Sequence, residues 1–241
     1  MRAWSVVRGE NVNSGGEPRL ASATRLCWAF YVRVIGIGGL LLACALGCAG
    51  QSWEIGAAAG YGLYRNASVY APDGKATAGI SNRFTLSGVL GQDRFEYFSG
   101  EVRYLYQDGD PFLRASSGKT NIQGQSHAIH YDLLAHFSPR RARIRPYLAV
   151  GLGAKWYIAN GPENPTQPLS DIALLAHTTD LKGLLTAGGG VKLRFGGVLV
   201  RLDFRDYITP FPKKLIVPVP FATARGLFQQ FTPLVGVSYS F

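Results

Sequence analysis

Between residue 53 and the end of the chain, apolar residues alternate with polar or small residues in eight separate segments. A period of two places successive side chains on opposite faces of a β-strand. Each segment has about the 9–11 residues, or slightly more, that a tilted strand needs to cross a bilayer. The predicted strands are 53–64, 79–90, 95–106, 124–137, 145–157, 183–194, 198–208 and 227–241.

The last predicted strand shows the alternation most clearly. One face carries Val235, Val237, Tyr239 and Phe241, and the other carries Leu234, Gly236, Ser238 and Ser240. A strand with one apolar face needs a neighbouring edge and an apolar surrounding, and a closed barrel in a membrane provides both. This ending resembles the C-terminal signature of bacterial outer-membrane β-barrels. The resemblance implies that Tyr239 and Phe241 are read by the barrel assembly machinery and that the last strand pairs with the first.

The connections between the predicted strands alternate in length. Segments 65–78, 107–123, 158–182 and 209–226 are long, whereas 91–94, 138–144 and 195–197 are short. The alternation predicts an all-β fold, an eight-stranded antiparallel up-and-down transmembrane β-barrel with long extracellular loops and short periplasmic turns. A soluble lipocalin-like barrel would place its apolar residues inside. In this chain the charged face is the inner one, which favours the membrane.

Aromatic residues are predicted to form two girdles at the membrane interfaces, where amphipathic rings are favoured. Those at the short-turn ends are Trp53, Phe137, Phe195, Tyr239 and Phe241; those towards the long loops are Tyr61, Tyr104, Tyr106, Trp156 and Phe228.

The first fifty residues have a different composition. All three cysteines (Cys27, Cys44 and Cys48) lie there, and residues 34–53 carry no charge. Basic residues, an apolar stretch and then small residues are typical of a signal peptide. We predict an apolar core at about 34–46 and cleavage near 49–51.

The predicted organisation is therefore an N-terminal extension plus signal peptide over 1–50 and an outer-membrane barrel over 51–241. Export to the periplasm and insertion into the outer membrane would follow. Three alternatives stay open: an uncleaved transmembrane helix, lipid attachment at Cys44 or Cys48, and a start of translation downstream of residues 1–24.

Ten charged residues are expected inside the barrel: Arg83, Glu101, Arg103, Asp132, Lys155, Lys192, Arg194, Arg201, Asp203 and Arg205. Buried charges need partners. We predict a lumen network of Glu101, Arg103, Asp132, Lys192, Arg194, Arg201, Asp203 and Arg205. Its role is either a structural plug, since eight strands leave an interior just wide enough to be filled, or a gate for water and small ions.

No catalytic, cofactor or metal site is predicted. His130 and Asp132, with Ser126 nearby, suggest a hydrolase, but 130 and 132 are side by side on one strand rather than arranged as a triad. The formal charge of +10 is spread through strands and turns, so nucleic acid is not an expected partner.

Residues 53–241 resemble the small eight-stranded outer-membrane barrels, the group of the OmpA transmembrane domain and OmpX. The resemblance rests on the Gly-rich first strand, Arg145-Pro146-Tyr147-Leu148, the segment 201–207 and the terminal Phe. It implies a role in envelope structure, adhesion or passage of small solutes. The sequence departs from the full-length OmpA-type pattern, which continues into a C-terminal peptidoglycan-binding domain, so a cell-wall-anchoring role is not expected unless another protein supplies it.

The expected function is structural or interactive, with outer-membrane lipid as surroundings and an extracellular ligand bound through loops 158–182 and 209–226. Within them, 169–181 is predicted to form a short amphipathic helix capped by Ser170 or Asp171. Segment 215–221 is apolar and is either a contact surface or a fold over the barrel mouth. The alternative function is a narrow channel for small or apolar solutes; a lipid-modifying enzyme is the third choice.

Overall fold

The structure is a computed structural model that describes residues 52–72, 74–161, 167–225 and 227–241. The predicted signal peptide and its cleavage near 49–51 lie outside the described residues. In the described ranges, no helix is long and apolar enough to cross a membrane.

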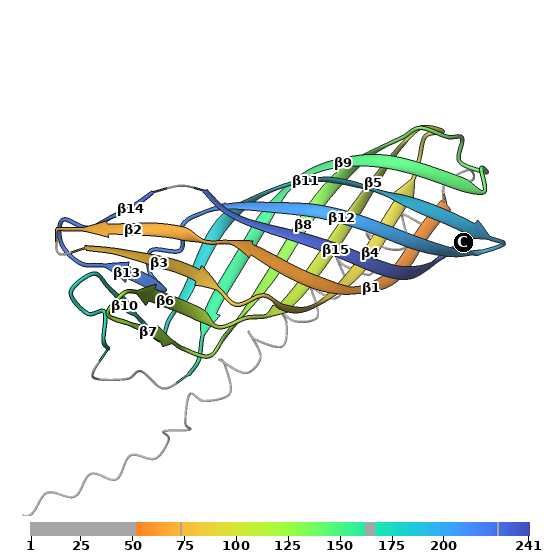
Figure 1. The fold of residues 1–241 in the computed structure, drawn as a ribbon. Helices are drawn as coiled ribbons and strands as arrows, with labels where there is room; N and C mark the ends of the chain where they lie inside the picture. Colours follow the sequence, from red (N-terminus) through yellow and green to blue (C-terminus); the bar gives the residue numbers. More distant parts are fainter. Residues whose placement is uncertain (1–51, 73, 162–166, 226) are drawn as a thin grey trace, which may run out of the picture. The chain divides into compact units, whose positions relative to one another are not determined.

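Eight strands form a closed antiparallel barrel (Figure 1). They are β1 (Ser52–Arg65), β4 (Arg83–Asp93), β5 (Phe98–Asp108), β8 (Gly124–His136), β9 (Ile144–Ala159), β11 (Thr179–Phe195), β12 (Val198–Pro210) and β15 (Leu227–Ser240). The order around the barrel is β1-β15-β12-β11-β9-β8-β5-β4, and β4 pairs with β1. The predicted fold class and the number of barrel strands are therefore confirmed, and each predicted segment overlaps one barrel strand; the segment 79–90 began too early, since residues 79–80 belong to β3 (Gly74–Ile80), outside the barrel.

The first and last strands close the barrel. Ile55 is opposite Tyr239 in the β1–β15 register. The N–H of Trp53 donates to the carbonyl of Phe241 at 2.8 Å, and the N–H of Phe241 donates to that of Trp53 at 2.9 Å. The predicted pairing of the last strand with the first is thus confirmed, and it leaves no open edge along this seam.

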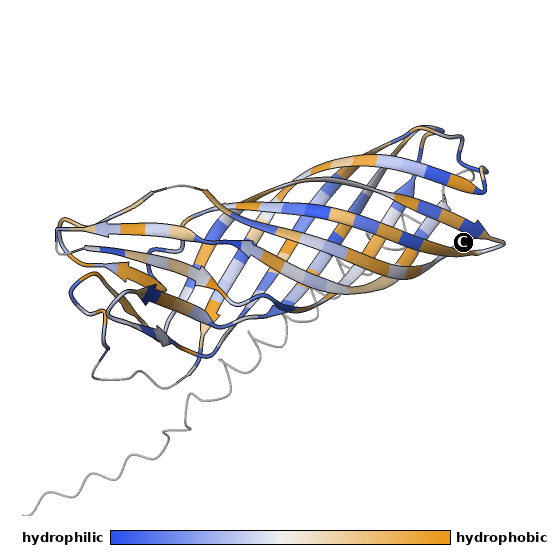
Figure 2. Cartoon of the chain, in the orientation of Figure 1, coloured by the Kyte–Doolittle hydropathy of each residue, from blue (hydrophilic) through white to orange (hydrophobic). Residues whose placement is uncertain are grey.

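The two faces of the barrel wall differ in polarity along every strand, visible as alternating colours in Figure 2. On β8, Ile129, Tyr131 and Leu133 are exposed on the outside, whereas His130 and Asp132 are buried inside. An apolar exterior over a polar interior is the arrangement that a bilayer requires of a spanning barrel.

The predicted long loops contain further strands, which the sequence pattern did not indicate. β2 (Ala67–Ala71), β3 (Gly74–Ile80), β6 (Pro111–Ala115), β7 (Gly118–Asn121) and β14 (Thr223–Arg225) form a five-stranded sheet in the order β14-β2-β3-β6-β7. We call it the loop sheet; it extends beyond the barrel at the end opposite the short turns (Figure 1). These strands are short and rich in Gly, Ala and Pro, so their period of two is weak.

The predicted helix at 169–181 is wrong. The N–H groups of Ile172 and Ala173 both donate to the carbonyl of Leu169 at 3.0 Å, and this single turn is followed by β10 (Ala173–Leu175). β10 pairs with β13 (Ile216–Pro218) of the other apolar loop. One isolated helical turn is unfavourable in water, whereas pairing satisfies the backbone and buries both apolar segments together.

A hydrophobic cluster fills the space between the loop sheet and the barrel mouth. It contains Tyr64, Ala67, Val69, Ala76, Ala78, Ile80, Leu113, Ile122, Tyr157, Ala159, Leu169, Ile172, Ala173, Leu175, Phe211, Leu215, Ile216 and Phe228. The apolar start of segment 215–221 is therefore folded inward over the mouth. Phe228 was predicted on the outer aromatic girdle, but the even-numbered residues of β15 face inward, and its ring packs on Tyr64.

Candidate functional site

The inward charges come mainly from two strands on opposite walls of the barrel. Four positions separate β5 from β12 in the eight-stranded order, so they face each other across the lumen. β5 contributes Glu101 and Arg103, while β12 contributes Arg201, Asp203 and Arg205. Because each set occupies alternate positions of its strand, all five side chains point inward.

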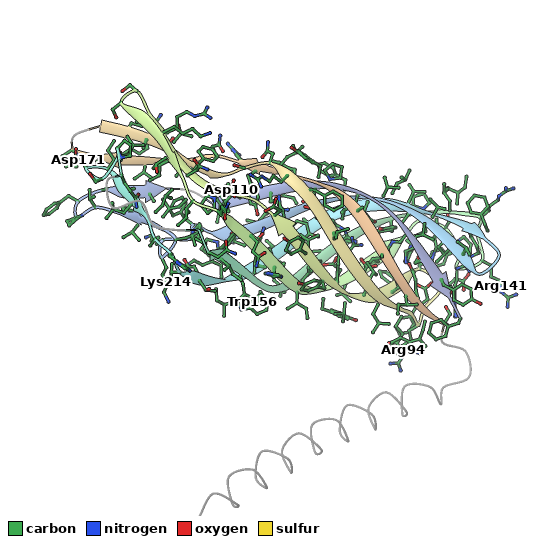
Figure 3. All side chains as sticks on the ribbon, turned by 90° about the horizontal axis from the view of Figure 1, so that it is seen from below. Arg94, Asp110, Arg141, Trp156, Asp171 and Lys214 are labelled. Atoms are coloured by element: carbon green, nitrogen blue, oxygen red, sulfur yellow. The ribbon has the colours of Figure 1, made fainter. Side chains whose placement is uncertain are left out.

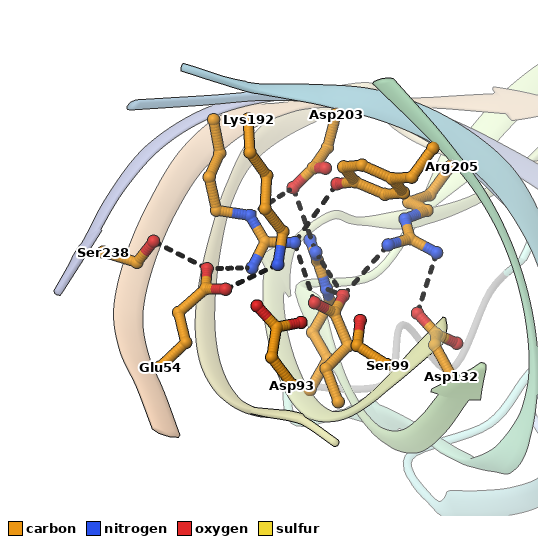
Figure 4. Close-up of polar contacts among 12 residues, drawn as sticks. Glu54, Asp93, Ser99, Asp132, Lys192, Asp203, Arg205 and Ser238 are labelled. Atoms are coloured by element: carbon orange, nitrogen blue, oxygen red, sulfur yellow. Dashed lines mark hydrogen bonds and ion pairs between the residues drawn. The ribbon is translucent and has the colours of Figure 1, made fainter. Parts of the chain in front are cut away.

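Glu101 lies at the centre of the network because it pairs with three arginines; Figure 4 shows the network and labels Glu54, Asp132, Lys192, Asp203 and Arg205 in it. Its Oε1 accepts from Nη2 of Arg103 at 2.7 Å and from Nη2 of Arg205 at 2.9 Å, and its Oε2 accepts from Nη2 of Arg201 at 2.8 Å. Arg103 Nη2 also donates to Asp203 Oδ2 at 2.9 Å. One carboxylate thus joins three guanidinium groups and links the two opposite walls.

A second carboxylate, Glu54 of β1, joins the network at the seam side. Its Oε2 lies 2.5 Å from Lys192 Nζ, and its Oε1 accepts from Arg201 Nη1 at 2.8 Å and from Ser238 Oγ at 2.7 Å. The predicted network did not include Glu54. The signal that could have identified it is the presence of one acidic residue in an otherwise Gly- and Ala-rich strand.

Asp132 connects β8 to the network. Its Oδ2 lies 2.8 Å from Arg205 Nη1, and its Oδ1 lies 2.8 Å from His130 Nδ1 and accepts from Thr186 Oγ1 at 2.6 Å. Charges from β1, β5, β8, β11 and β12 are thereby connected through shared partners.

Seven of the eight residues predicted for this network are brought together: Glu101, Arg103, Asp132, Lys192, Arg201, Asp203 and Arg205. Arg194 instead lies partly exposed near the short-turn end of β11. Arg83 is exposed at the long-loop end of β4 and pairs with Asp108 and Asp110. Alternation alone cannot distinguish the lumen from its two rims, where water solvates a charge.

The central side chains of the network are fully buried. Arg103 and Arg205 are 0% exposed and Glu101 is 1% exposed, so no water-sized sphere reaches the two guanidinium groups. Two further pairs lie among the buried residues towards the short turns: Arg145 Nη1 with Asp93 Oδ2 at 2.8 Å, and Ser99 Oγ with His136 Nε2 at 2.8 Å.

The side chain of Lys155 contacts two rings of the hydrophobic cluster, those of Tyr64 and Tyr157. Lys155 of β9 is fully buried, with Nζ 4.9 Å from the ring centre of Tyr64 and 5.0 Å from that of Tyr157. Nζ donates to the hydroxyl of Tyr64 at 2.9 Å and to Oε1 of Gln230. Ring faces and oxygen acceptors surround the buried Nζ in place of a carboxylate.

The network is not fully satisfied. Arg103 Nη1, Asp203 Oδ1 and Arg205 Nε have no hydrogen-bond partner among the described side chains. Buried ion pairs with incomplete hydrogen bonding contribute little net stability, but removal of one partner leaves an uncompensated charge. We therefore expect the intact network to add little to the free energy of unfolding, whereas removal of one of its charges should lower that free energy strongly.

The residues that suggested a hydrolase are not assembled as one. Ser126 Oγ lies 3.3 Å from the hydroxyl of Tyr64, while His130 is bonded to Asp132. His127 faces outward and bonds the hydroxyl of Tyr104 at 2.6 Å. In the described part of the chain, no group of three or more His, Cys, Asp or Glu side chains is arranged to hold a metal ion.

No protein-family model and no curated protein sequence matches the chain. Solved structures do match it. The outer membrane protein OprG from Pseudomonas aeruginosa is 10% identical, with a TM-score of 0.54, and the match covers 80% of this chain and 96% of that one.

Neisserial surface protein A (NspA) is 13% identical, with a TM-score of 0.45, over 80% of this chain and 98% of that one. The N-terminal β-barrel domain of OprF from Pseudomonas aeruginosa is 15% identical, with a TM-score of 0.43, over 79% and 97% of the two chains.

The closed order of eight strands, the apolar exterior and the match to OprG agree with one another. The chain has the fold of the small eight-stranded outer-membrane β-barrels. At identities this low the match establishes the fold alone, and the role of this outer-membrane barrel has to be argued from its own residues.

Proposed function

We propose that this outer-membrane barrel is a closed scaffold that presents the loop sheet outside the cell for binding. Its lumen network acts as a structural plug and not as an ion pathway. The proposal assigns no catalytic step to the protein.

The observation that carries the proposal is the burial of the cross-lumen ion pairs. Glu101, Arg103, Arg201 and Arg205 connect opposite walls, and each is at most 2% exposed. Towards the long loops lies the hydrophobic cluster, with Lys155 against its rings Tyr64 and Tyr157. A solute would have to displace both layers, which supports a closed barrel over a channel.

The proposed orientation places the loop sheet outside the cell and the short turns in the periplasm. Export through the predicted signal peptide, with cleavage near 49–51, would deliver the chain to the periplasm. Tyr239 and Phe241 would then present the last strand to the barrel assembly machinery. Their exposed rings stack at 6.3 Å beside the β1–β15 seam, which supports recognition at that edge.

The alternative is a narrow channel for small or apolar solutes, which would give discrete current steps in a planar bilayer. We expect the refolded protein to give no discrete current steps in a planar bilayer, because paired charges fill the lumen. Glu101→Ala and Asp203→Ala should show steps or increased leak, since each loses a carboxylate that joins opposite walls.

Current steps in the unmodified protein that change in size with these two variants would contradict the scaffold and favour a gated pore. The matched control is Glu96→Ala, which removes an exposed carboxylate at the short-turn rim. Folding of every sample is verified by the difference in gel mobility between unheated and boiled protein.

A further inference from the structure

Strand pairing has a break between the barrel and the loop sheet. The last residue pair between β1 and β15 is Arg65 with Gln229, and pairing resumes between β2 and β14 at Ser68. A cavity of about 830 Å³ lies at this break. Six of its lining residues are polar: Arg65, Asn66, Ser68, Tyr70, Thr223 and Gln229.

The cavity lies at the outer limit of the apolar belt. On the outward face of β1, Ile55, Tyr61 and Leu63 are exposed, and Arg65 is the first charged residue beyond them. Leu227, which also lines the cavity, is 63% exposed. Apolar residues on one side and a cation with hydroxyl and amide groups on the other suit a molecule with acyl chains and a polar headgroup.

A row of side chains that includes two cations crosses the solvent face of the loop sheet, beginning at Ser68 of the cavity lining. Ser68 is opposite Thr77, Thr77 is opposite Arg114, and Arg114 is opposite Lys119. Because directly opposed residues share a face, these four form one row that spans about 14 Å. The guanidinium of Arg114 and the ammonium of Lys119 lie 5.6 and 5.8 Å from the ring centre of Phe112, which restricts their positions before any ligand binds.

Four carboxylates near the long-loop end are bonded to other groups, and one of them, Asp206, accepts through Oδ2 from Nε2 of the cavity-lining Gln229 at 3.3 Å. Asp108 and Asp110 pair with Arg83, and Asp180 pairs with Lys182. Among the described residues, no carboxylate lies within ion-pair distance of Arg65, Arg114 or Lys119. The cavity and the row together carry the three cations Arg65, Arg114 and Lys119, whereas one carboxylate, that of Asp206, is bonded to the cavity lining, so this surface has an excess of positive charge.

We infer that this surface binds the headgroup of a phosphorylated glycolipid of the surrounding outer leaflet. Arg65, Arg114 and Lys119 bind phosphate groups, and the hydroxyl and amide groups around the cavity bind sugar hydroxyls. The acyl chains lie against the exposed apolar residues below Arg65. This site rests on the proposed orientation of the loop sheet outside the cell.

The test is native mass spectrometry of the full chain in zwitterionic detergent micelles. The probe is a glucosamine disaccharide that carries two phosphates and acyl chains, compared with the same lipid without phosphates. We expect the dissociation constant of the phosphorylated lipid to rise about a hundredfold in Arg65→Gln/Arg114→Gln/Lys119→Gln, since each cation near a charged lipid contributes about fivefold.

The matched control is Arg94→Gln/Arg141→Gln/Arg143→Gln, which removes three exposed cations at the short-turn end, where Figure 3 labels Arg94 and Arg141. We expect this control to bind as the unmodified protein does. Equal losses in the two triple variants, or equal binding of the two lipids, would overturn the site. If the first triple variant does not fold, Arg65→Gln alone should show about a fivefold loss; no loss would overturn the site.

Conductance is recorded on the same samples. If the unmodified protein carries no current and binds the phosphorylated and unphosphorylated lipids equally, the lipid site is overturned and the scaffold stays intact. Current steps in the unmodified protein would instead overturn the scaffold.

Discussion

Replacement of Glu101 by alanine is expected to lower the free energy of unfolding by about 3–5 kcal/mol, the cost of breaking a buried ion pair from one side. The carboxylate is shared by Arg103, Arg201 and Arg205. Its removal leaves these three cations close together in a space with no access to water. Urea titration of the protein refolded in lipid vesicles, followed by tryptophan fluorescence, measures the change.

Two further variants are compared with Glu101→Ala: one keeps the shape of Glu101 without its charge, and the other removes a carboxylate from the surface. Glu101→Gln keeps the oxygen acceptor and the volume, so it should lose less stability than the alanine variant. Glu96→Ala, at the exposed β4–β5 turn, should stay within about 0.5 kcal/mol of the unmodified protein, as most surface substitutions do. If Glu101→Ala unfolds at the same urea concentration as Glu96→Ala, the network does not stabilise the barrel.

Replacement of Gly151 by alanine is expected to destabilise the barrel by about 1–3 kcal/mol, the usual cost of overpacking. A Cβ at this position on β9 would lie 2.0 Å from Asp132 Oδ1 and 2.4 Å from the carbonyl oxygen of Tyr131. The backbone carbonyl belongs to the neighbouring strand and cannot move without breaking the ladder. Asp132 would have to move away from Arg205.

Gly88 provides the matched control because it also lies within a barrel strand. No described atom lies within 4 Å of a Cβ added at Gly88. Gly88→Ala should therefore leave the stability unchanged or raise it by up to about 1 kcal/mol through a less flexible unfolded chain. If Gly151→Ala and Gly88→Ala have the same free energy of unfolding in this urea titration, the lumen at Gly151 has space for an added methyl group and the prediction is wrong.

The barrel could be predicted almost completely from the sequence. Strand direction and number follow from the period of two and the alternating connection lengths, as in β8 with its exposed Tyr131 and buried Asp132. Both signals are local, and a bilayer enforces them on every strand. The pairing of Tyr239 and Phe241 with the first strand followed from the resemblance to outer-membrane barrels.

The loops could not be predicted in the same way. β10 and β13 form a pair although about forty residues separate them in the chain, and the apolar character of each gave no indication of its partner. Phe228 shows the same limitation within a strand. Its aromatic ring suits an interface girdle, but the side on which it lies follows from the register of β15 against β12 and β1.

The sequence by itself determined that this chain forms an eight-stranded barrel with apolar residues towards lipid and charges inside. These properties depend only on residues that are neighbours along a strand. Only the tertiary structure decided that Glu54 shares Arg201 with Glu101, that Arg194 stays at the rim, and that the loops form a sheet beside the Arg65 cavity. The physical reason is that the stagger of the strands around the closed barrel sets which side chains share one height, and no stretch of sequence encodes that stagger alone.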